Sequence, residues 1–446
     1  MITANCTNME LSSDQEIALK GLLAWFQASH KSRYITLGGY AGTGKTTLMA
    51  ILRQELFRIN PGLRIAFCSY TGRAARNLEE RLEEHKCLLP NDRVSTIHRL
   101  IYSPIESPDG SIIGWSKAGR PKAGLIVLDE ASMADAEIWQ DLLSYGIPII
   151  AVGDHGQLPP INGKFNLMEH PDLTLKHIHR QAESNPIIQV SQQARETGMV
   201  SPGIYGPGVK KFLRSDEFSK EAIGELLENF HQDTLILCGY NSTRLKINAQ
   251  IRQNIGFESP DPAPGDRVIC LKNNHRKGIY NGMLGTIIDI YAADNGRREA
   301  QIQMDGMRKP YHGFISADQF GSKENPNAFG GSSVIEHKES PAAKLQSLLG
   351  GIPGISLGLK TAGTQTTTAE SVPKPRINAG MAKPLLRDTD YFDFGYALTV
   401  HKAQGSQARK VILLEERFPK MDDETWRRWL YTGVTRAQEE LYIFGD

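Results

Sequence analysis

The stretch that most constrains this chain is a glycine-rich loop between a short apolar run and a helix-like segment. Residues 34–47 read YITLGGYAGTGKTT, and Gly39, Gly44, Lys45 and Thr46 fill the fixed positions of the phosphate-binding motif G-x-x-x-x-G-K-[ST]. In that motif, backbone N–H groups surround phosphate oxygens, the lysine reaches the β- and γ-phosphates, and the hydroxyl ligates Mg²⁺. A glycine-rich turn before an ordinary helix is the alternative. Because strand, loop and helix follow in order, we expect the chain to bind a nucleoside triphosphate.

Composition bounds the class of protein. The chain has 446 residues, 40% of them apolar, which predicts a soluble globular protein of two or more domains. The net charge of +1 does not indicate a nucleic-acid partner, although a locally basic groove is compatible with it. Five scattered cysteines without a C-x-x-C pair favour reduced thiols over disulfides or a zinc site. Without a long apolar run or a leader-like N-terminus, we expect a cytoplasmic protein that does not enter a membrane.

Apolar runs that end in polar residues recur along the chain. LIVLD (125–129) and IPIIAVGD (147–154) read as buried strands, and their alternation with helices predicts an α/β fold with parallel sheets. Active groups in such sheets lie beyond the carboxyl ends of the strands. A helix is expected at 16–27, with Ser12, Ser13 or Asp14 as its cap and Glu16 completing a capping box. A small hairpin is expected at 102–123, around the turn Pro108-Asp109-Gly110.

Several charged and amide side chains are candidates for phosphoryl chemistry. Asp129 could hold Mg²⁺, and Glu130 could position and deprotonate the attacking water. Helix capping is the alternative role for this pair. The Gln157 amide could sense the γ-phosphate. Arg180 or Arg436 could stabilise charge on the transferred phosphoryl group, although either could instead form a surface ion pair.

A second group of residues suits contacts with a nucleic-acid strand. TVHKAQGS (399–406) gathers hydroxyl, imidazole, ammonium and amide groups in one short stretch. Trp115, Tyr102 and Tyr70 could stack on bases, with burial in a core as the alternative for each.

Together these stretches resemble the superfamily 1 DNA helicases, in particular their RecD/Dda/Pif-like branch. The ordered matches are a glutamine for the Q motif, followed along the chain by GGYAGTGKTT, CSYTGRAAR, STIHRL, VLDEASM, VGDHGQLPPI, HRQ, ALTVHKAQGSQ and YTGVTRAQEELYI. GDRVICLKNN with YNGMLGTI is similar to the segment that enters an SH3-like accessory module in that branch. The resemblance covers about residues 11–300 and 394–444.

The resemblance implies roles for individual residues. Catalytic roles fall on Lys45, Asp129, Glu130, Gln157, Arg180 and Arg436. ATP would be bound by Gln15, Gly42, Thr43, Gly44, Lys45, Thr46, Thr47 and Gly405, and Mg²⁺ by Thr46 and Asp129. DNA would be contacted by Thr71, His98, Thr399, His401 and Lys402, with Trp115 as a stacking tip on the hairpin.

The resemblance also implies a domain plan. It predicts two RecA-like domains with parallel sheets, a small β-rich SH3-like accessory module and a strand-separating wedge at the hairpin. The expected bounds are 1–185 for the first RecA-like domain, 186–264 with 386–446 for the second, and 265–385 for the inserted module. Within that module, 322–384 is rich in Gly, Ser, Thr, Ala and Pro, which indicates a flexible or irregular stretch.

The function implied is an ATP- and Mg²⁺-dependent DNA helicase that moves 5′ to 3′ on single strands, as a monomer. Its partners would be single-stranded DNA, junctions with duplex, and single-strand-binding, replication, recombination or repair proteins. Two alternatives stay open: a translocase that displaces proteins without efficient unwinding, and a non-catalytic subunit that uses nucleotide as a switch. Gln407 departs from the acidic residue that many relatives carry, which bears on the coupling of ATP to DNA contacts.

Overall fold

The structure is a computed structural model that describes most of the chain. The described residues are 11–446 without 29–31, 107–111, 160–164, 179–184, 232, 273, 275–276, 280, 294–295, 306, 308 and 323–388. The irregular stretch predicted at 322–384 therefore lies outside the described residues, except for Ser322.

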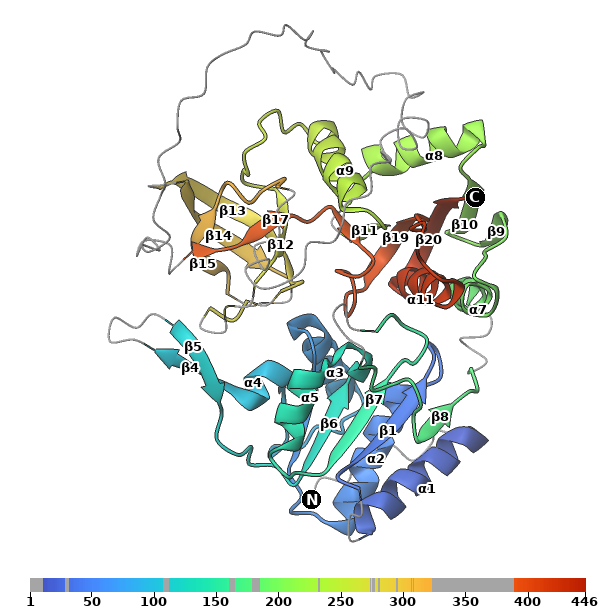
Figure 1. The fold of residues 1–446 in the computed structure, drawn as a ribbon, viewed down its shortest axis with the longest axis vertical. Coiled ribbons are helices and arrows are strands. Elements are labelled where there is room, and N and C mark those ends of the chain that lie inside the picture. The colour runs from blue at the N-terminus through green and yellow to red at the C-terminus, as the bar shows by residue number, and fades with distance from the viewer. Residues whose placement is uncertain are drawn as a thin grey trace, which may run out of the picture.

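The first unit is a six-stranded parallel sheet in the order β3-β2-β6-β7-β1-β8 (Figure 1). Its strands are β1 Tyr34–Gly39, β2 Ile65–Ser69, β3 Arg93–Thr96, β6 Leu125–Asp129, β7 Ile149–Gly153 and β8 Leu173–Leu175. Its helices are α1 Ser13–Gln27, α2 Lys45–Ile59, α3 Gly72–Glu84, α4 Ile97–Ile101 and α5 Ala136–Leu143, with the 3₁₀ turn η1 at Ala131–Met133.

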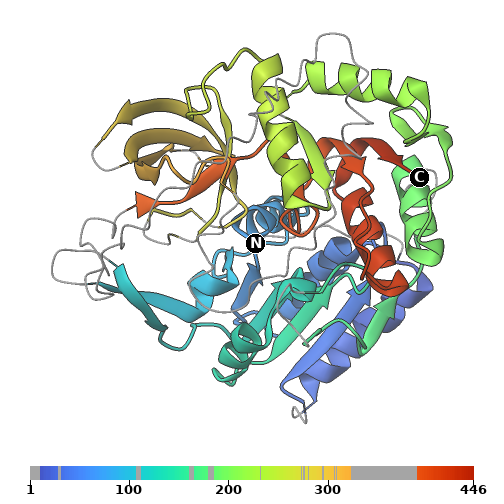
Figure 2. The same ribbon diagram turned by 45° about the horizontal axis from the view of Figure 1, so that its top comes forward.

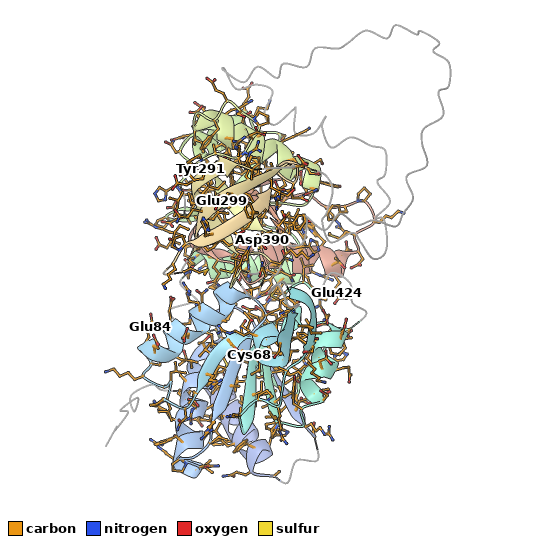
Figure 3. The ribbon with its side chains drawn as sticks, turned by 90° about the vertical axis from the view of Figure 1, so that its left-hand side faces the viewer. Cys68, Glu84, Tyr291, Glu299, Asp390 and Glu424 are labelled. Carbon is orange, nitrogen blue, oxygen red and sulfur yellow. The ribbon has the colours of Figure 1, made fainter. Side chains whose placement is uncertain are left out.

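Both faces of this sheet are buried, which is why its strands are continuously apolar. Phe67 packs into the cluster under α1 and α2, whereas Cys68, the next residue in β2, packs into the cluster under α5. Successive side chains of a strand point to opposite faces, so a strand covered on both sides needs apolar residues throughout. Figure 3 shows Cys68 inside this unit.

The N-cap of α1 is one of the three predicted residues, but its capping-box partner differs from the prediction. Ser12 is the N-cap residue, so the third helical position is Gln15 rather than Glu16. The Gln15 side-chain oxygen accepts a hydrogen bond from the Ser12 backbone N–H (3.1 Å). Glu16 instead faces Lys20 one turn later. The capping glutamine is the same residue that the resemblance assigns to ATP.

The second unit is a six-stranded sheet in the order β18-β11-β19-β20-β10-β9, parallel except for β9 against β10. Its strands are β9 Gly203–Gly206, β10 Val209–Leu213, β11 Thr234–Cys238, β18 Ala397–Thr399, β19 Ala408–Leu414 and β20 Ala437–Gly445. Its helices are α7 Pro186–Thr197, α8 Glu217–Glu228, α9 Asn241–Asn254 and α11 Asp423–Val434.

A third, mainly antiparallel sheet has the order β16-β15-β14-β13-β12-β17. Its strands are β12 Arg267–Cys270, β13 Leu284–Ala292, β14 Arg297–Met304, β15 Tyr311–Ser316, β16 Thr389–Asp390 and β17 Phe392–Phe394. The last two belong to this sheet, although the predicted boundary at 385/386 puts them in the second domain. Figure 3 shows Tyr291, Glu299 and Asp390 on this module.

Buried ion pairs join the third sheet to α9. Arg244 on α9 pairs with Asp393 in β17 (2.7 Å), and Arg252 on α9 pairs with Asp266 just before β12 (2.8 Å). Removing one partner of such a pair would leave a buried charge uncompensated. These contacts therefore fix the module against the second unit.

A two-stranded antiparallel hairpin, β4 Tyr102–Glu106 with β5 Ile112–Lys117, leaves the first unit after α4. It projects toward the same side of the molecule as the third sheet in both ribbon views (Figure 2). Among the described helices, none combines the length and apolar character needed to cross a bilayer.

Candidate active site

The phosphate-binding loop joins β1 to α2. Gly42 (φ +81°) and Gly44 (φ +72°) lie in the left-handed region, where a Cβ would add strain, and Gly44 is the N-cap of α2. The Lys45 ammonium reaches back over the loop and donates to the carbonyls of Gly39 (2.7 Å) and Tyr40 (2.9 Å). The loop thus holds a lysine ammonium beside the positive end of a helix, the arrangement that binds phosphate.

Two predicted ATP residues support this loop from its side. Thr43 is buried, and its hydroxyl donates to the Tyr40 carbonyl (2.8 Å). The buried Gln15 amide donates to the Thr43 carbonyl (3.1 Å), so the capping residue of α1 also contacts the loop. Thr47 lies in the first turn of α2.

Asp129 ends β6 and Glu130 follows it, at the carboxyl edge of the sheet. Glu130 has a left-handed backbone (φ +53°, ψ +39°), which is uncommon for a residue with a Cβ and is found at functional sites. Burial, followed by the charge of Glu130, raises the pKa of Asp129 to about 6, while the positive charges of Lys45 and Arg81 oppose that rise. The two adjacent carboxylates therefore create an environment that favours a bound cation.

A cavity of about 40 Å³ lies between the two parallel-sheet units. Its wall from the first unit includes Thr46, Asp129 and Glu130, and its wall from the second unit includes Gly405 and Arg436. These are five of the residues that the sequence assigns to ATP or its hydrolysis. The structure therefore brings together in space residues that lie up to 390 positions apart in the chain.

Arg436 is held rigidly on the second wall. It is 2% exposed, and its guanidinium donates to the carbonyls of Thr432 (3.0 Å) and Ser406 (3.3 Å) and to the Thr435 hydroxyl (3.1 Å). Gly405 (φ +71°) lies directly beside Thr71 of the first unit, since a Cβ at Gly405 would lie 2.9 Å from the Thr71 hydroxyl oxygen. The second wall thus presents a fixed guanidinium close to the opposing loop.

Of the predicted catalytic residues that the structure describes, Lys45 and Gln157 do not line this cavity. The cavity lining does not include Gln157; its amide nitrogen is 3.5 Å from Asp154 Oδ2, and no described residue donates to its buried side-chain oxygen. Arg180 lies outside the described residues.

Sequence reasoning missed two residues at this site. Arg81 on α3 lines the cavity, and its guanidinium donates to the Thr46 hydroxyl (3.3 Å). Tyr431 on α11 donates to Asp154 and accepts from the phosphate-binding loop. The signal for Arg81 was helical register, since it lies seven residues after Ala74 on the face of α3 that lines the cavity. Tyr431 opens YTGVTRAQEELYI, one of the matched stretches, but nothing in that stretch indicated contacts with the first unit.

Thr46 and Asp129 fit a magnesium ion. Both supply oxygen donors, which Mg²⁺ prefers, and a cation would favour the ionised form of Asp129, whose pKa is raised first by burial and then by the charge of Glu130. In the part of the chain that the structure describes, no three His, Cys, Asp or Glu side chains gather as a metal-binding group. A magnesium ion here would therefore complete its shell with phosphate and water oxygens, as is common for this metal.

Three of the predicted DNA residues belong to the first unit: Thr71 at the start of α3, His98 on α4 and Trp115 in the hairpin. The Thr71 hydroxyl caps α3 by accepting from the Ala74 N–H (3.1 Å). The His98 ring on α4 lies 5.4 Å from Tyr70 and 6.2 Å from Tyr102, between ring centroids. Trp115 lies in β5 opposite Pro104. The strand-contact role of these residues stays a prediction.

Three further candidates follow β18. Thr399 ends that strand, and its carbonyl accepts from the Ala403 N–H (3.1 Å), which closes a turn. Burial lowers the pKa of His401, so this imidazole is neutral near pH 7. Burial and the nearby Arg244 charge lower the pKa of the Lys402 ammonium to about 8. The charge on Lys402 is therefore sensitive to pH in the neutral range.

Comparison with known proteins gives consistent matches. Residues 10–203 match the family described as AAA domain, and residues 394–444 match the UvrD-like helicase C-terminal domain. The ATP-dependent RecD2 DNA helicase of Deinococcus radiodurans is 24% identical over 93% of this chain, but the match spans only 47% of that protein. The ATP-dependent DNA helicase dda of Enterobacteria phage T4 is 23% identical over 92% of this chain and 94% of its own length.

Solved structures show a similar fold. A crystal structure of Bacteroides Pif1 bound to single-stranded DNA superposes with a TM-score of 0.50 at 16% identity, and covers 98% of this chain and 92% of that one. At this identity the likeness concerns the fold alone. The parallel-sheet α/β units agree with it.

Proposed function

We propose, starting from the fact that this chain belongs to the RecD/Pif-like branch of the superfamily 1 helicases, that it is an ATP-dependent DNA helicase. The chain spans less than half the length of RecD2, so this activity is a proposal about the chain itself. The observation that carries it is the cavity with Thr46, Asp129 and Glu130 on one wall and Arg436 on the other.

Hydrolysis follows from the side chains on these walls. The Lys45 ammonium leaves the loop carbonyls to contact the terminal phosphates, and the Glu130 carboxylate accepts a proton from the attacking water. Arg436 stabilises the charge that develops on the transferred phosphoryl group. Magnesium, held by Thr46 and Asp129, supplies neutralisation of phosphate charge when it is bound.

Movement on DNA would follow from the division of the cavity walls between the two parallel-sheet units. Because each unit supplies part of one site, nucleotide binding and release alter how the two units are held together. Thr71, His98, Thr399, His401 and Lys402 contact the DNA backbone, and the third sheet is an SH3-like accessory module beside the strand. The β4–β5 hairpin separates the duplex, and movement is 5′ to 3′, as the branch implies. The protein works as a monomer on single strands and junctions.

The direct test measures ATP hydrolysis with and without single-stranded DNA, then unwinding of duplexes with a 5′ or a 3′ overhang. Stimulated hydrolysis with unwinding only from the 5′ overhang is the expected result. Unwinding only from the 3′ overhang would contradict the polarity, and an absence of stimulation would contradict the DNA assignment.

The hairpin proposal has its own test. Trp115→Ala should reduce duplex unwinding several-fold while single-stranded DNA still stimulates hydrolysis, because base stacking at a tip acts only at the fork. The measurement is the ratio of base pairs opened to ATP consumed. An unchanged ratio, also after deletion of 105–118, would favour the translocase without efficient unwinding.

A further inference from the structure

The Tyr431 hydroxyl links the two parallel-sheet units at the phosphate-binding loop. It accepts a hydrogen bond from the backbone N–H of Ala41 (2.8 Å) and donates one to Asp154 Oδ2 (2.7 Å). Tyr431 is on α11 in the second unit, whereas Ala41 and Asp154 follow β1 and β7 in the first. One hydroxyl therefore joins three separate segments.

The direction of these hydrogen bonds follows from burial. Tyr431 is 1% exposed, and burial together with the charge of Asp154 raises the pKa of its phenol well above the usual value. The phenol therefore stays protonated, gives its only proton to the carboxylate and has a lone pair for the Ala41 amide. A hydrogen bond to an ionised acceptor is stronger than one between neutral groups.

Further contacts lock the same two segments together. The Leu158 N–H donates to the hydroxyl of Thr432, the neighbour of Tyr431 (3.0 Å), and the Leu158 carbonyl accepts from Gln404 (2.8 Å). Gly156 fits tightly here, since a Cβ would lie 3.1 Å from the Tyr431 ring. The 154–158 segment is thus docked on α11.

Arg436 depends on the same helix. It follows α11 by two residues, and its guanidinium bonds to the carbonyl of Thr432 inside that helix. A rotation or shift of α11 relative to the phosphate-binding loop would therefore move Arg436 relative to Thr46 and Glu130. The Tyr431 hydroxyl is the contact that joins this helix directly to the loop backbone.

We propose that Tyr431 is a positioning residue that sets Arg436 against the phosphate-binding loop and reports the state of that loop to the second unit. This inference rests on the proposed ATPase. Tyr431 does not touch the reacting atoms; it acts by holding α11, Ala41 and Asp154 in one arrangement.

The test is Tyr431→Phe, which removes only the hydroxyl, beside Tyr396→Phe as a matched control. Tyr396 is also 1% exposed and also donates to a buried carboxylate, Asp266 (2.7 Å), but between β18 and the third sheet, away from the cavity. We expect Tyr431→Phe to lower the kcat of ATP hydrolysis about tenfold with a smaller change in KM, because transition-state contacts are affected more than substrate binding. Tyr396→Phe should lose comparable thermal stability and keep kcat.

A readout independent of turnover is hydrogen exchange at the Ala41 amide. Without nucleotide, exchange in the peptide that contains Ala41 should accelerate in Tyr431→Phe and stay as in the parent chain in Tyr396→Phe. Equal kcat values and equal exchange for the two variants would overturn the inference. If Tyr431→Phe does not fold, Asp154→Asn removes the negative charge of the acceptor instead and so weakens the same hydrogen bond, and it should lower kcat as well.

The two proposals fail in different ways. A parent chain that binds no ATP or hydrolyses none would contradict the proposed ATPase. A parent chain that hydrolyses ATP, with a Tyr431→Phe variant that matches Tyr396→Phe, would contradict only the role of Tyr431.

Discussion

The two parallel sheets have similar architecture but contribute opposite chemistry to the cavity between them. The first sheet brings the phosphate-binding loop and two carboxylates, Asp129 and Glu130, beyond its carboxyl edge. The second brings a buried guanidinium, Arg436, and a left-handed glycine, Gly405. Neither unit holds the complete set, so chemistry at this site requires the two units to meet.

The two units also differ in how firmly hydrogen bonds hold the cationic side chain that each contributes. Arg436 makes three hydrogen bonds within its own unit, whereas among the described residues the Lys45 ammonium donates to two loop carbonyls that a phosphate can replace. The first wall is therefore built to receive the ligand, and the second to present a fixed charge to it. Substitutions on the two walls should have distinguishable effects.

The largest effect is expected on the first wall. Lys45→Ala removes the ammonium that contacts the terminal phosphates, and kcat should fall on the order of a thousandfold or more. The fold should persist, because only two hydrogen bonds to loop carbonyls are lost. Steady-state hydrolysis measures the change in kcat, and thermal unfolding measures whether the fold persists. Unchanged turnover would contradict the assignment of Lys45 to the ATP site.

A double-mutant cycle tests whether the two walls act as one unit. Glu130→Gln and Arg436→Ala should each lower kcat on the order of a hundred- to a thousandfold. The double variant should be little worse than either single variant, because groups that act in the same transition state are not additive. Effects that multiply would mean that the two walls contribute independently and do not form one site.

A smaller effect is expected where the walls touch. Gly405→Ala adds a Cβ 2.9 Å from the Thr71 hydroxyl oxygen, at a φ of +71°. We expect DNA stimulation of hydrolysis to fall about tenfold, since Thr71 also caps α3 and must shift. Gly146→Ala is the control, because it has a similar φ of +62° with nothing within 4 Å. Equal behaviour of the two variants would attribute the effect to backbone strain alone.

The smallest expected effect concerns pH. The pKa of Lys402 is lowered to about 8, so its positive charge is present below pH 8 and lost as the pH rises through that value. Affinity for single-stranded DNA should therefore fall roughly two- to fivefold between pH 7 and pH 9 at constant salt, the size expected for one phosphate contact. In Lys402→Arg this loss should largely vanish. A variant with the same pH profile as the parent chain would assign the profile to another group.

Local sequence signals predicted the parts of the site that are continuous in the chain. The phosphate-binding loop, and Asp129 and Glu130 at the end of LIVLD, lie at the predicted strand ends, because burial on both faces of a parallel sheet demands unbroken apolar runs. The parallel arrangement of both sheets was predictable for the same reason. Arg436 reaches the cavity, but only packing of the two units brings it there.

Features that depend on packing between distant segments were not predictable. Gln157 follows its strand as expected, yet its amide lies near Asp154 because the 154–158 segment is docked on α11. Within residues 389–394, β16 and β17 are too short for a strand pattern to show in the sequence. They belong to the third sheet because β16 pairs with β15 and β17 pairs with β12. Tyr431 opens the matched stretch YTGVTRAQEELYI, but its partners could not be predicted, because Ala41 and Asp154 lie 390 and 277 residues away.

The left-handed backbone of Glu130 lowers the stability of the fold, whereas its carboxylate is proposed to serve ATP hydrolysis. For a residue with a Cβ, this backbone conformation costs roughly 1–2 kcal/mol of folding free energy. Glycine avoids that cost, and asparagine tolerates the conformation better than glutamate does. A laboratory selection for heat resistance alone would therefore be expected to replace Glu130. We expect such a variant to unfold at a higher temperature and to bind ATP, with hydrolysis slowed on the order of a hundred- to a thousandfold.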